Sequence, residues 1–492
     1  MGFVVRSPHS SELKFRCDMV WLVGVECRRG QMSSLRAVVV ASVLGCALLV
    51  GSAPASADPT DDPAAPVSPG PSDLQRWINT DIPAPALPPV VSQSSGEVPP
   101  DLAALWQAVR PAPSGDRMFD EWPDGLGGLA PGDIVEWRDV TETSAQLAMV
   151  PIQRAILLKF RTTDASGKPS FGTATVVIPA AAWTGPGDRP VLVNALPINS
   201  LGLSCTPSYA MAHGWHSNFN SGDLIPPNTA WALSRGYAVL IPDHEGPLMA
   251  YAEPMVAGHV LLDSIRAVRG MLPTEFTGSR FAITGYSGGA IASYAAAMLL
   301  DEYAPELSGV VVGAAVGGLV TDYRMVAEHF NGNMASGILL VVALAMSREH
   351  PEVLGYMNHL AQWAATSPIK DTCGATNGPL GVVGIPIDVA ANISDPLRSD
   401  IADQIFARLN LTDRKSGAPL YIYHAANDIW IPRENGDGLY RDQCARGIPA
   451  VHRTEPGEHV IALFTGFPGE TDWIDGRLRG EPAPSECAAP PR

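Results

Sequence analysis

Hydrophobic and polar positions settle into a regular alternation from about residue 190 onward. Short continuous apolar runs alternate with longer helical stretches. Continuous apolar runs are typical of parallel strands that are covered by helices on both faces. The predicted strands are Pro190–Leu196, Tyr237–Ile241, Arg280–Thr284, Gly309–Val312, Pro419–His424 and Val451–Thr454. The predicted helices are Asn228–Arg235, Met255–Met271, Ser287–Leu300, Asn435–Cys444 and one after His459. The pattern predicts an α/β fold with a mainly parallel sheet.

Two interruptions frame this alternation. Before it, Arg154–Arg161 and Gly172–Pro179 flank the turn-rich segment Asp164–Pro169, which predicts a hairpin at one edge of the sheet. Within it, the rhythm breaks between about residues 318 and 418, where several helical stretches predict an inserted cap. The run Gly337–Met346 is apolar on all sides, which favours a buried cap helix over a lid that touches lipid.

The composition divides the chain into five segments. They are 1–57, an export signal with a mis-called extension before Met32; 58–115, a Pro- and Ala-rich leader; 116–317, the first part of the core; 318–418, the helical cap; and 419–492, the second part of the core. The leader has little periodicity, so we expect it to be extended and to carry no chemistry.

The prediction of an export signal rests on positively charged residues, an apolar stretch and small residues near the N-terminus. Arg28, Arg29 and Arg36 precede the apolar stretch Ala37–Val50, and Ala55–Ala57 offers a cleavage site. A membrane anchor is the alternative, but the stretch is shorter than the roughly 20 residues that span a bilayer. Lipid attachment at Cys46 is a weaker alternative. We therefore expect a secreted protein, either extracellular or associated with the cell wall.

Composition and charge narrow the class of partner. Hydrophobic residues make up 46% and charged residues 17% of the chain, as in a well-buried globular enzyme. The 33 basic and 50 acidic residues give a net charge of −17, and no basic run is present. A nucleic-acid partner is therefore excluded. Any contact with a lipid surface would have to be hydrophobic, and we assign it to the cap.

One five-residue segment carries the nucleophile signature. Gly285-Tyr286-Ser287-Gly288-Gly289 matches the elbow in which a serine occupies a strained turn from strand to helix. A predicted strand precedes it and an alanine-rich helix follows, which is the context that the motif requires. An ordinary glycine-rich turn is the alternative reading.

The remaining triad members follow in the order Ser, Asp, His that this fold requires. Asp428 comes directly after a predicted strand, and His459 lies between the last strand and the last helix. His424 and His452 fall inside predicted strands, where a core role is favoured, and His244 precedes the serine. We therefore predict Ser287 as nucleophile, His459 as general base and Asp428 as the residue that orients it.

An oxyanion needs two further donors. The backbone N–H of Gly288 is one, and the second is expected from the loop Pro197–Ser200, which follows a predicted strand. His213 and His216 lack a third zinc ligand, and no phosphate-binding glycine motif is present. The sequence predicts neither a metal nor a cofactor.

Removal of the signal leaves four cysteines, which in an exported chain imply two disulfides. They are Cys205, Cys373, Cys444 and Cys487. From the residues alone, three pairings are open.

From about Trp137 to the C-terminus the chain resembles the secretory lipase family, the lipase A-like α/β-hydrolases of fungi and actinobacteria. The motifs that carry the resemblance are Thr163–Pro169, Leu196–Ser200, Ser204–Tyr209, Gly236–Gly246, Gly285–Ala290, Tyr303–Leu307, His424–Asp428 and Gly457–His459. The resemblance implies an α/β-hydrolase fold with a cap between the serine and the aspartate that holds the acyl chain. It implies a carboxylic-ester hydrolase that accepts triacylglycerols.

The resemblance also assigns individual residues. It implies the triad Ser287, Asp428 and His459, oxyanion donors at Gly288 and Asn199, and disulfides Cys205–Cys373 and Cys444–Cys487. Asn199 stands where the family member compared has Asp; a backbone donor survives that change. The motif Asp243–Gly246 is interpreted as a structural polar network.

Three functions follow from these expectations. The first is a triacylglycerol lipase of lipid catabolism that works through an acyl-enzyme on Ser287. The second keeps the triad but acts on short esters or transfers the acyl group to an envelope acceptor. The third, from a different class, is a catalytically silent hydrolase-fold binding module, against which the intact triad argues.

Overall fold

The computed structural model describes residues 70–90, 98–215, 227–374 and 384–489, all within one compact unit, Val67–Arg492. The predicted export signal and His216 lie outside these residues. No helix in the described part is long and apolar enough to cross a membrane.

The described residues form one nine-stranded sheet with the strand order β1-β2-β3-β5-β4-β6-β7-β8-β9. The strands are β1 Ile134–Asp139, β2 Ile152–Thr163, β3 Pro169–Pro179, β4 Val191–Ala195, β5 Ala238–Pro242, β6 Phe281–Tyr286, β7 Val311–Gly317, β8 Leu420–Ala425 and β9 Ala450–Glu455. Pairing is antiparallel from β1 to β5 and parallel from β5 to β9. The six predicted parallel strands and the hairpin, β2 with β3, are confirmed.

Two details of the sheet differ from the prediction. The hairpin is not outermost, because β1 pairs with β2 beyond it; the solvent-facing residues of β1 hid the strand from the apolar pattern. β7 continues to Gly317, past its predicted end, through residues of low strand propensity. Glycine is needed there because a Cβ on Gly313 would lie 2.5 Å from Trp473, and one on Gly317 would lie 2.2 Å from Tyr423.

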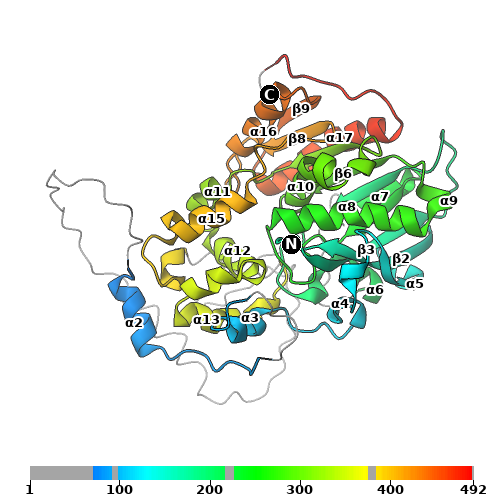
Figure 1. Cartoon of the computed structure of the whole chain (residues 1–492). Helices are drawn as coiled ribbons and strands as arrows, with labels where there is room; N and C mark the ends of the chain where they lie inside the picture. Colours follow the sequence, from blue (N-terminus) through cyan, green and yellow to red (C-terminus); the bar gives the residue numbers. More distant parts are fainter. Residues whose placement is uncertain (1–69, 91–97, 216–226, 375–383, 490–492) are drawn as a thin grey trace, which may run out of the picture. The chain divides into compact units, whose positions relative to one another are not determined.

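Helices cover both faces of the sheet (Figure 1). One face carries α8 Pro254–Met271, α10 Gly288–Tyr303 and α16 Glu434–Ala445. The other carries α5 Thr141–Ala145, α6 Pro207–His213, α7 Asn228–Ser234 and α17 His459–Leu478. Successive residues of β6 point to opposite faces of the sheet. Ile283 packs with α8 and α10, and Ala282 packs in the cluster that contains α6, α7 and α17. This arrangement is a doubly covered sheet of the α/β-hydrolase type.

Between β7 and β8 the described chain is helical. Its helices are α11 Tyr323–Phe330, α12 Ser336–Glu349, α13 His359–Thr366 and α15 Asp400–Leu409. Short 3-10 turns join them at Pro351–Tyr356, Pro368–Asp371, Ile387–Ala390 and Pro396–Arg398. Every residue of α12 is buried or half-buried, so the apolar run Gly337–Met346 is core, as favoured from the sequence.

The described part of the predicted leader is partly helical. It forms α2 Asp73–Asp81 and α3 Ala103–Val109, and α4 Arg117–Asp120 follows. α3 lies beside α12 and α13 (Figure 1), where the Trp106 indole N–H donates to the Arg348 carbonyl at 2.9 Å. α2 begins with a capping box between Ser72 and Gln75. The expectation of an extended leader was wrong at α2 and α3, because Pro-rich flanks obscured two short helices that pack on the segment between β7 and β8.

Candidate active site

Ser287 occupies the turn between β6 and α10 with φ 53° and ψ −119°, a conformation that non-glycine residues rarely adopt. Its glycine neighbours make the turn possible. A Cβ on Gly285 would lie 2.2 Å from the Gly289 carbonyl oxygen, and a Cβ on Gly289 would lie 1.9 Å from that of Ala195. The glycines of the motif are therefore required by the close approach of backbone to backbone.

The structure brings the three predicted triad residues together. His459 Nε2 lies 2.9 Å from Ser287 Oγ, and His459 Nδ1 lies 2.7 Å from Asp428 Oδ2. His459 is the first residue of α17, whose N-terminus is capped by the Glu458 carboxylate. The Tyr286 hydroxyl donates to the His459 carbonyl at 2.6 Å, which fixes the histidine backbone from the strand side.

Asp428 is held in a loop directly after β8, and its side chain is fully buried. Its Oδ1 accepts the backbone N–H groups of Trp430 at 2.9 Å and Ile431 at 2.8 Å, so Oδ2 faces His459. Burial acts to raise the pKa of Asp428, but hydrogen bonds from His424 and His459 outweigh it and hold the pKa below its usual range. The carboxylate is thus ionised whenever the histidine works as a base.

His424 is a second histidine beside Asp428, at 3.3 Å from Nε2 to Oδ2. Its Nε2 also lies 2.9 Å from the Ile431 carbonyl oxygen. Sequence reasoning placed it correctly in a buried strand but missed this contact. The four-residue separation from Asp428 was the available signal, although it does not reveal the path of the loop.

The oxyanion side is formed by the first turn of α10 and the loop after β4. Asn199 has φ 49°, and a Cβ on Gly288 would lie 1.8 Å from Asn199 Oδ1. The Asn199 carboxamide therefore lies directly against Gly288. The backbone N–H groups of Asn199 and Ser200 make hydrogen bonds with the carboxyl group of Glu245. The expectation of a second oxyanion donor at Asn199 stays a prediction.

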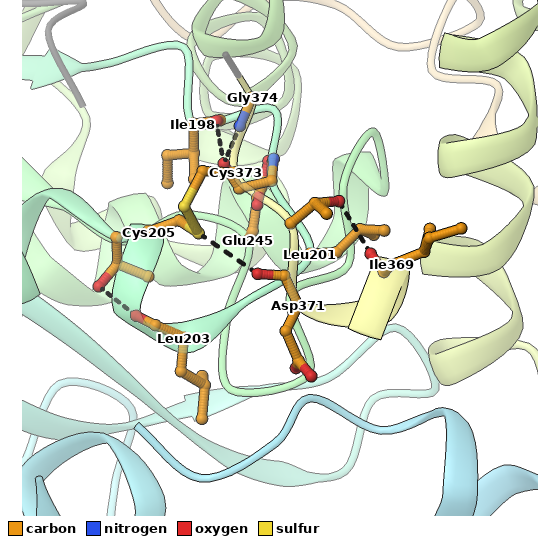
Figure 2. Close-up of a disulfide and its surroundings, with 12 residues drawn as sticks. Ile198, Leu201, Leu203, Cys205, Glu245, Ile369, Asp371, Cys373 and Gly374 are labelled. Atoms are coloured by element: carbon orange, nitrogen blue, oxygen red, sulfur yellow. Dashed lines mark hydrogen bonds between the residues drawn. A yellow bond between two sulfur atoms is a disulfide. The ribbon is translucent and has the colours of Figure 1, made fainter. Parts of the chain in front are cut away.

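Two disulfides join the four cysteines: Cys205 with Cys373 and Cys444 with Cys487, at S–S distances of 2.00 and 2.07 Å. Figure 2 shows the first beside the loop after β4. Next to it, the Gly374 N–H donates to Ser200 Oγ at 2.9 Å, and the Leu201 N–H donates to the Thr372 carbonyl at 2.9 Å. This disulfide therefore joins the segment after α13 to the oxyanion side of the site.

Other candidate residues lie away from the triad. His213 ends α6, where it stacks on Tyr209 and its Nε2 lies 3.0 Å from Asp116. His452 Nε2 lies 3.2 Å from Asp437 of α16. Among the described residues, no group of three or more His, Cys, Asp or Glu side chains could hold a metal ion.

A nucleophile elbow after β6, a buried carboxylate after β8 and a histidine after β9 of a mainly parallel sheet define the α/β-hydrolases as the structural class. Comparison with known proteins gives the family. Residues 228–486 match the family model "Secretory lipase", and the chain belongs to that family. It is a hydrolase of the lipase and carboxylesterase kind.

Individual relatives are moderately similar. Lipase 10 of Candida albicans is 28% identical over 399 residues, which cover 76% of this chain and 83% of the relative. A Mycobacterium tuberculosis protein named "Probable inactive lipase MT1628" is 28% identical over 393 residues, covering 78% and 86%. The crystal structure of Candida antarctica lipase A superposes with a TM-score of 0.70 at 25% identity, covering 78% of this chain and 90% of that one.

Proposed function

We propose that the protein is a secreted triacylglycerol lipase of lipid catabolism that forms an acyl-enzyme on Ser287. The observation that carries the proposal is the hydrogen-bonded chain from Ser287 through His459 to Asp428. Family membership supports ester hydrolysis as the reaction.

In the proposed mechanism, Ser287 Oγ attacks the ester carbonyl carbon while His459 Nε2 takes the hydroxyl proton. The oxyanion that forms lies beside the N–H of Gly288 at the start of α10, with Asn199 as the second donor. Collapse of this intermediate breaks the bond to the alcohol, which leaves with the proton from His459. Water then attacks the acyl-enzyme, His459 takes its proton and returns it to Ser287, and the carboxylic acid departs.

We propose that residues 318–418 form the cap that receives the acyl chain and, at its outer surface, makes transient contact with lipid. The helices described between β7 and β8 support this role, because they belong to the segment that joins the strand beside Ser287 to the strand before Asp428. The two disulfides support export, since such bonds persist in oxidising compartments. The predicted signal at residues 1–57 gives the route.

The test is hydrolysis by the purified mature protein of p-nitrophenyl esters from acetate to palmitate and of emulsified tributyrin and triolein. We expect cleavage of long-chain esters and triolein, and loss of activity by at least about 10³-fold in Ser287→Ala. Cleavage of short esters alone would replace the lipase with an esterase. Transfer to an added alcohol or sugar without hydrolysis would indicate an acyltransferase. No Ser287-dependent reaction at all would favour the silent binding module.

A further inference from the structure

Three consecutive buried side chains directly after β5 have no part in the mechanism above. They belong to Asp243, His244 and Glu245, each at most 3% exposed. Asp243 accepts the Thr173 hydroxyl at 2.5 Å and the Ser208 N–H at 2.9 Å, which fixes the start of α6. His244 Nε2 lies 2.8 Å from the Leu196 carbonyl oxygen, at the start of the oxyanion loop, Leu196–Leu201.

Glu245 reaches the centre of the same loop. Its Oε1 accepts the Ser200 N–H at 3.4 Å, and the Asn199 N–H makes a second hydrogen bond with the carboxyl group. Figure 2 shows Glu245 with Ile198 and Leu201 of this loop around the disulfide. The Ser200 hydroxyl turns back to the Ile198 carbonyl at 2.6 Å. The loop is therefore fixed from inside, by a carboxyl group that solvent does not reach.

This anchoring maintains an unfavourable backbone conformation. Asn199 lies in the left-handed region, which is unfavourable for a non-glycine residue and persists only when the surroundings determine it. The Asn199 and Ser200 N–H groups have the Glu245 carboxyl group as their hydrogen-bond partner. The Asn199 side chain is what the loop presents to Gly288.

We propose that Glu245 is the positioning residue of the oxyanion loop, and that Asn199 stabilises the oxyanion through its side-chain carboxamide N–H, next to the backbone N–H of Gly288. Either end of the carboxamide can occupy the position against Gly288, since half a turn exchanges Oδ1 and Nδ2. A negatively charged oxygen selects the donor end. The inference rests on the proposed function and assigns a role to the Asp243–Gly246 motif.

Arg348 supports the same arrangement from α12. It is 1% exposed, and its guanidinium donates to the carbonyls of Leu201 at 2.9 Å and Leu248 at 2.9 Å. Leu201 is the last residue of the oxyanion loop, and Leu248 follows the Asp243–Gly246 turn. The charge of Arg348 also favours the ionised form of Glu245, in opposition to burial, which raises the pKa of that carboxyl group. Arg348 of α12 thus contacts both the oxyanion loop and the segment that follows Glu245.

The experiment is a double-mutant cycle with p-nitrophenyl butyrate on the full chain, with kcat per active site counted by serine-directed phosphonate titration. Asn199→Gly keeps the backbone N–H and accepts the positive φ, but lacks the carboxamide. We expect its kcat to fall about 10²- to 10³-fold with KM changed less than threefold, the loss typical of one oxyanion donor. Unchanged kcat in Asn199→Gly would overturn the proposed side-chain donor.

Glu245 is tested by two variants of similar size. Glu245→Gln keeps an acceptor for the two N–H groups and should retain kcat within about threefold, whereas Glu245→Met removes the acceptor and should lose about 10²-fold. Combined with Asn199→Gly, Glu245→Met should add almost nothing, because it acts through Asn199. Additive losses, or an inactive but folded Glu245→Gln, would contradict the positioning role. If Glu245→Met does not fold, Glu245→Gln and Asn199→Gly still decide.

Failure here is distinguishable from failure of the proposed function. If Ser287→Ala remained active, the triad itself would be wrong. If activity depends on Ser287 but does not respond to Asn199→Gly, the triad stands and only the assignment of the second donor falls.

Discussion

At the scale of single residues, the space beside the serine is set by a glycine. The position of a Cβ on Gly288 is taken by Asn199 Oδ1, at 1.8 Å, and Tyr251 lies 3.5 Å away on another side. Real Cβ atoms do not approach an oxygen so closely, so even the smallest side chain must displace Asn199 or the start of α10.

Gly288→Ala should therefore lower kcat for p-nitrophenyl butyrate about 10²-fold, because the oxyanion donor is moved. The matched control is Gly438→Ala in α16, where a Cβ has no heavy atom within 4 Å. That change should leave kcat unaltered and raise the free energy of unfolding by about 0.5–1 kcal/mol. Equal kcat in the two variants would mean that the loop carrying Asn199 can move aside without loss of catalysis.

The sequence was sufficient for the residues whose order and local context define them. The elbow glycines predicted Ser287, and strand ends followed by short polar loops predicted Asp428 and His459, which the structure brings within hydrogen-bond distance. The contacts of Glu245 with the oxyanion loop could not be predicted. They join two loops whose meeting depends on β4 and β5 being neighbours in the sheet, and no local pattern encodes that adjacency.

At the scale of elements, the sequence predicted the strands that are buried on both faces, and it failed to predict the strand and helices that are only partly buried. The parallel strands are continuous apolar runs because helices cover both faces. β1 is a half-exposed edge strand, and α2 and α3 are short helices within a Pro-rich segment. Their stability comes from packing on distant elements, as with Trp106 on α12. Tertiary contacts of this kind leave only a weak trace in the local sequence.

The two disulfides offer a test of element coupling. The paired cysteines are 168 and 43 residues apart in the sequence, so each disulfide closes a long loop. Replacing either pair with serines should therefore lower the free energy of unfolding by roughly 2–5 kcal/mol. Only Cys205–Cys373 borders the oxyanion loop, through Gly374 and Ser200.

Loss of that bond should therefore also reduce kcat, by about tenfold, while Cys444–Cys487 serves as the control with kcat preserved. Urea unfolding and p-nitrophenyl butyrate kinetics at 25 °C measure both effects. A fall in kcat in the Cys444–Cys487 variant of the same size would show that general destabilisation, rather than the position of the loop, is responsible.

At the scale of the whole molecule, several acids are buried without a cation close by. Burial raises the pKa of Asp243 and of Glu470 to about 7, and it raises the pKa of Glu349, which is half-buried in α12, to about 8. Each folded-state pKa lies above its unfolded value, so the folded state binds these protons more tightly. The stability that they provide is present in full below about pH 4 and is lost as pH rises through 7 to 8. We expect the free energy of unfolding to fall between pH 5 and pH 8.

Glu470 gives the cleanest measure of this effect. It lies inside α17, is 1% exposed, and accepts hydrogen bonds from the hydroxyls of Thr284 on the nucleophile strand and Tyr423. A shift from 4.5 to about 7 corresponds to a maximum of about 3 kcal/mol by linkage. Glu470→Gln cannot ionise, so it should unfold with the wild-type free energy, within about 1 kcal/mol, at pH 5, where the acid is mainly protonated.

At pH 8 the wild type must bury a carboxylate, and Glu470→Gln should be more stable than the wild type by up to about 3 kcal/mol. Urea unfolding at pH 5, 6.5 and 8 measures the difference, with Glu434→Gln as the control, because Glu434 is exposed in the first turn of α16. The control should follow the wild type at all three pH values. A difference between Glu470→Gln and the wild type that did not grow with pH would mean that Glu470 does not titrate in this range, and that the decline must come from the other buried acids.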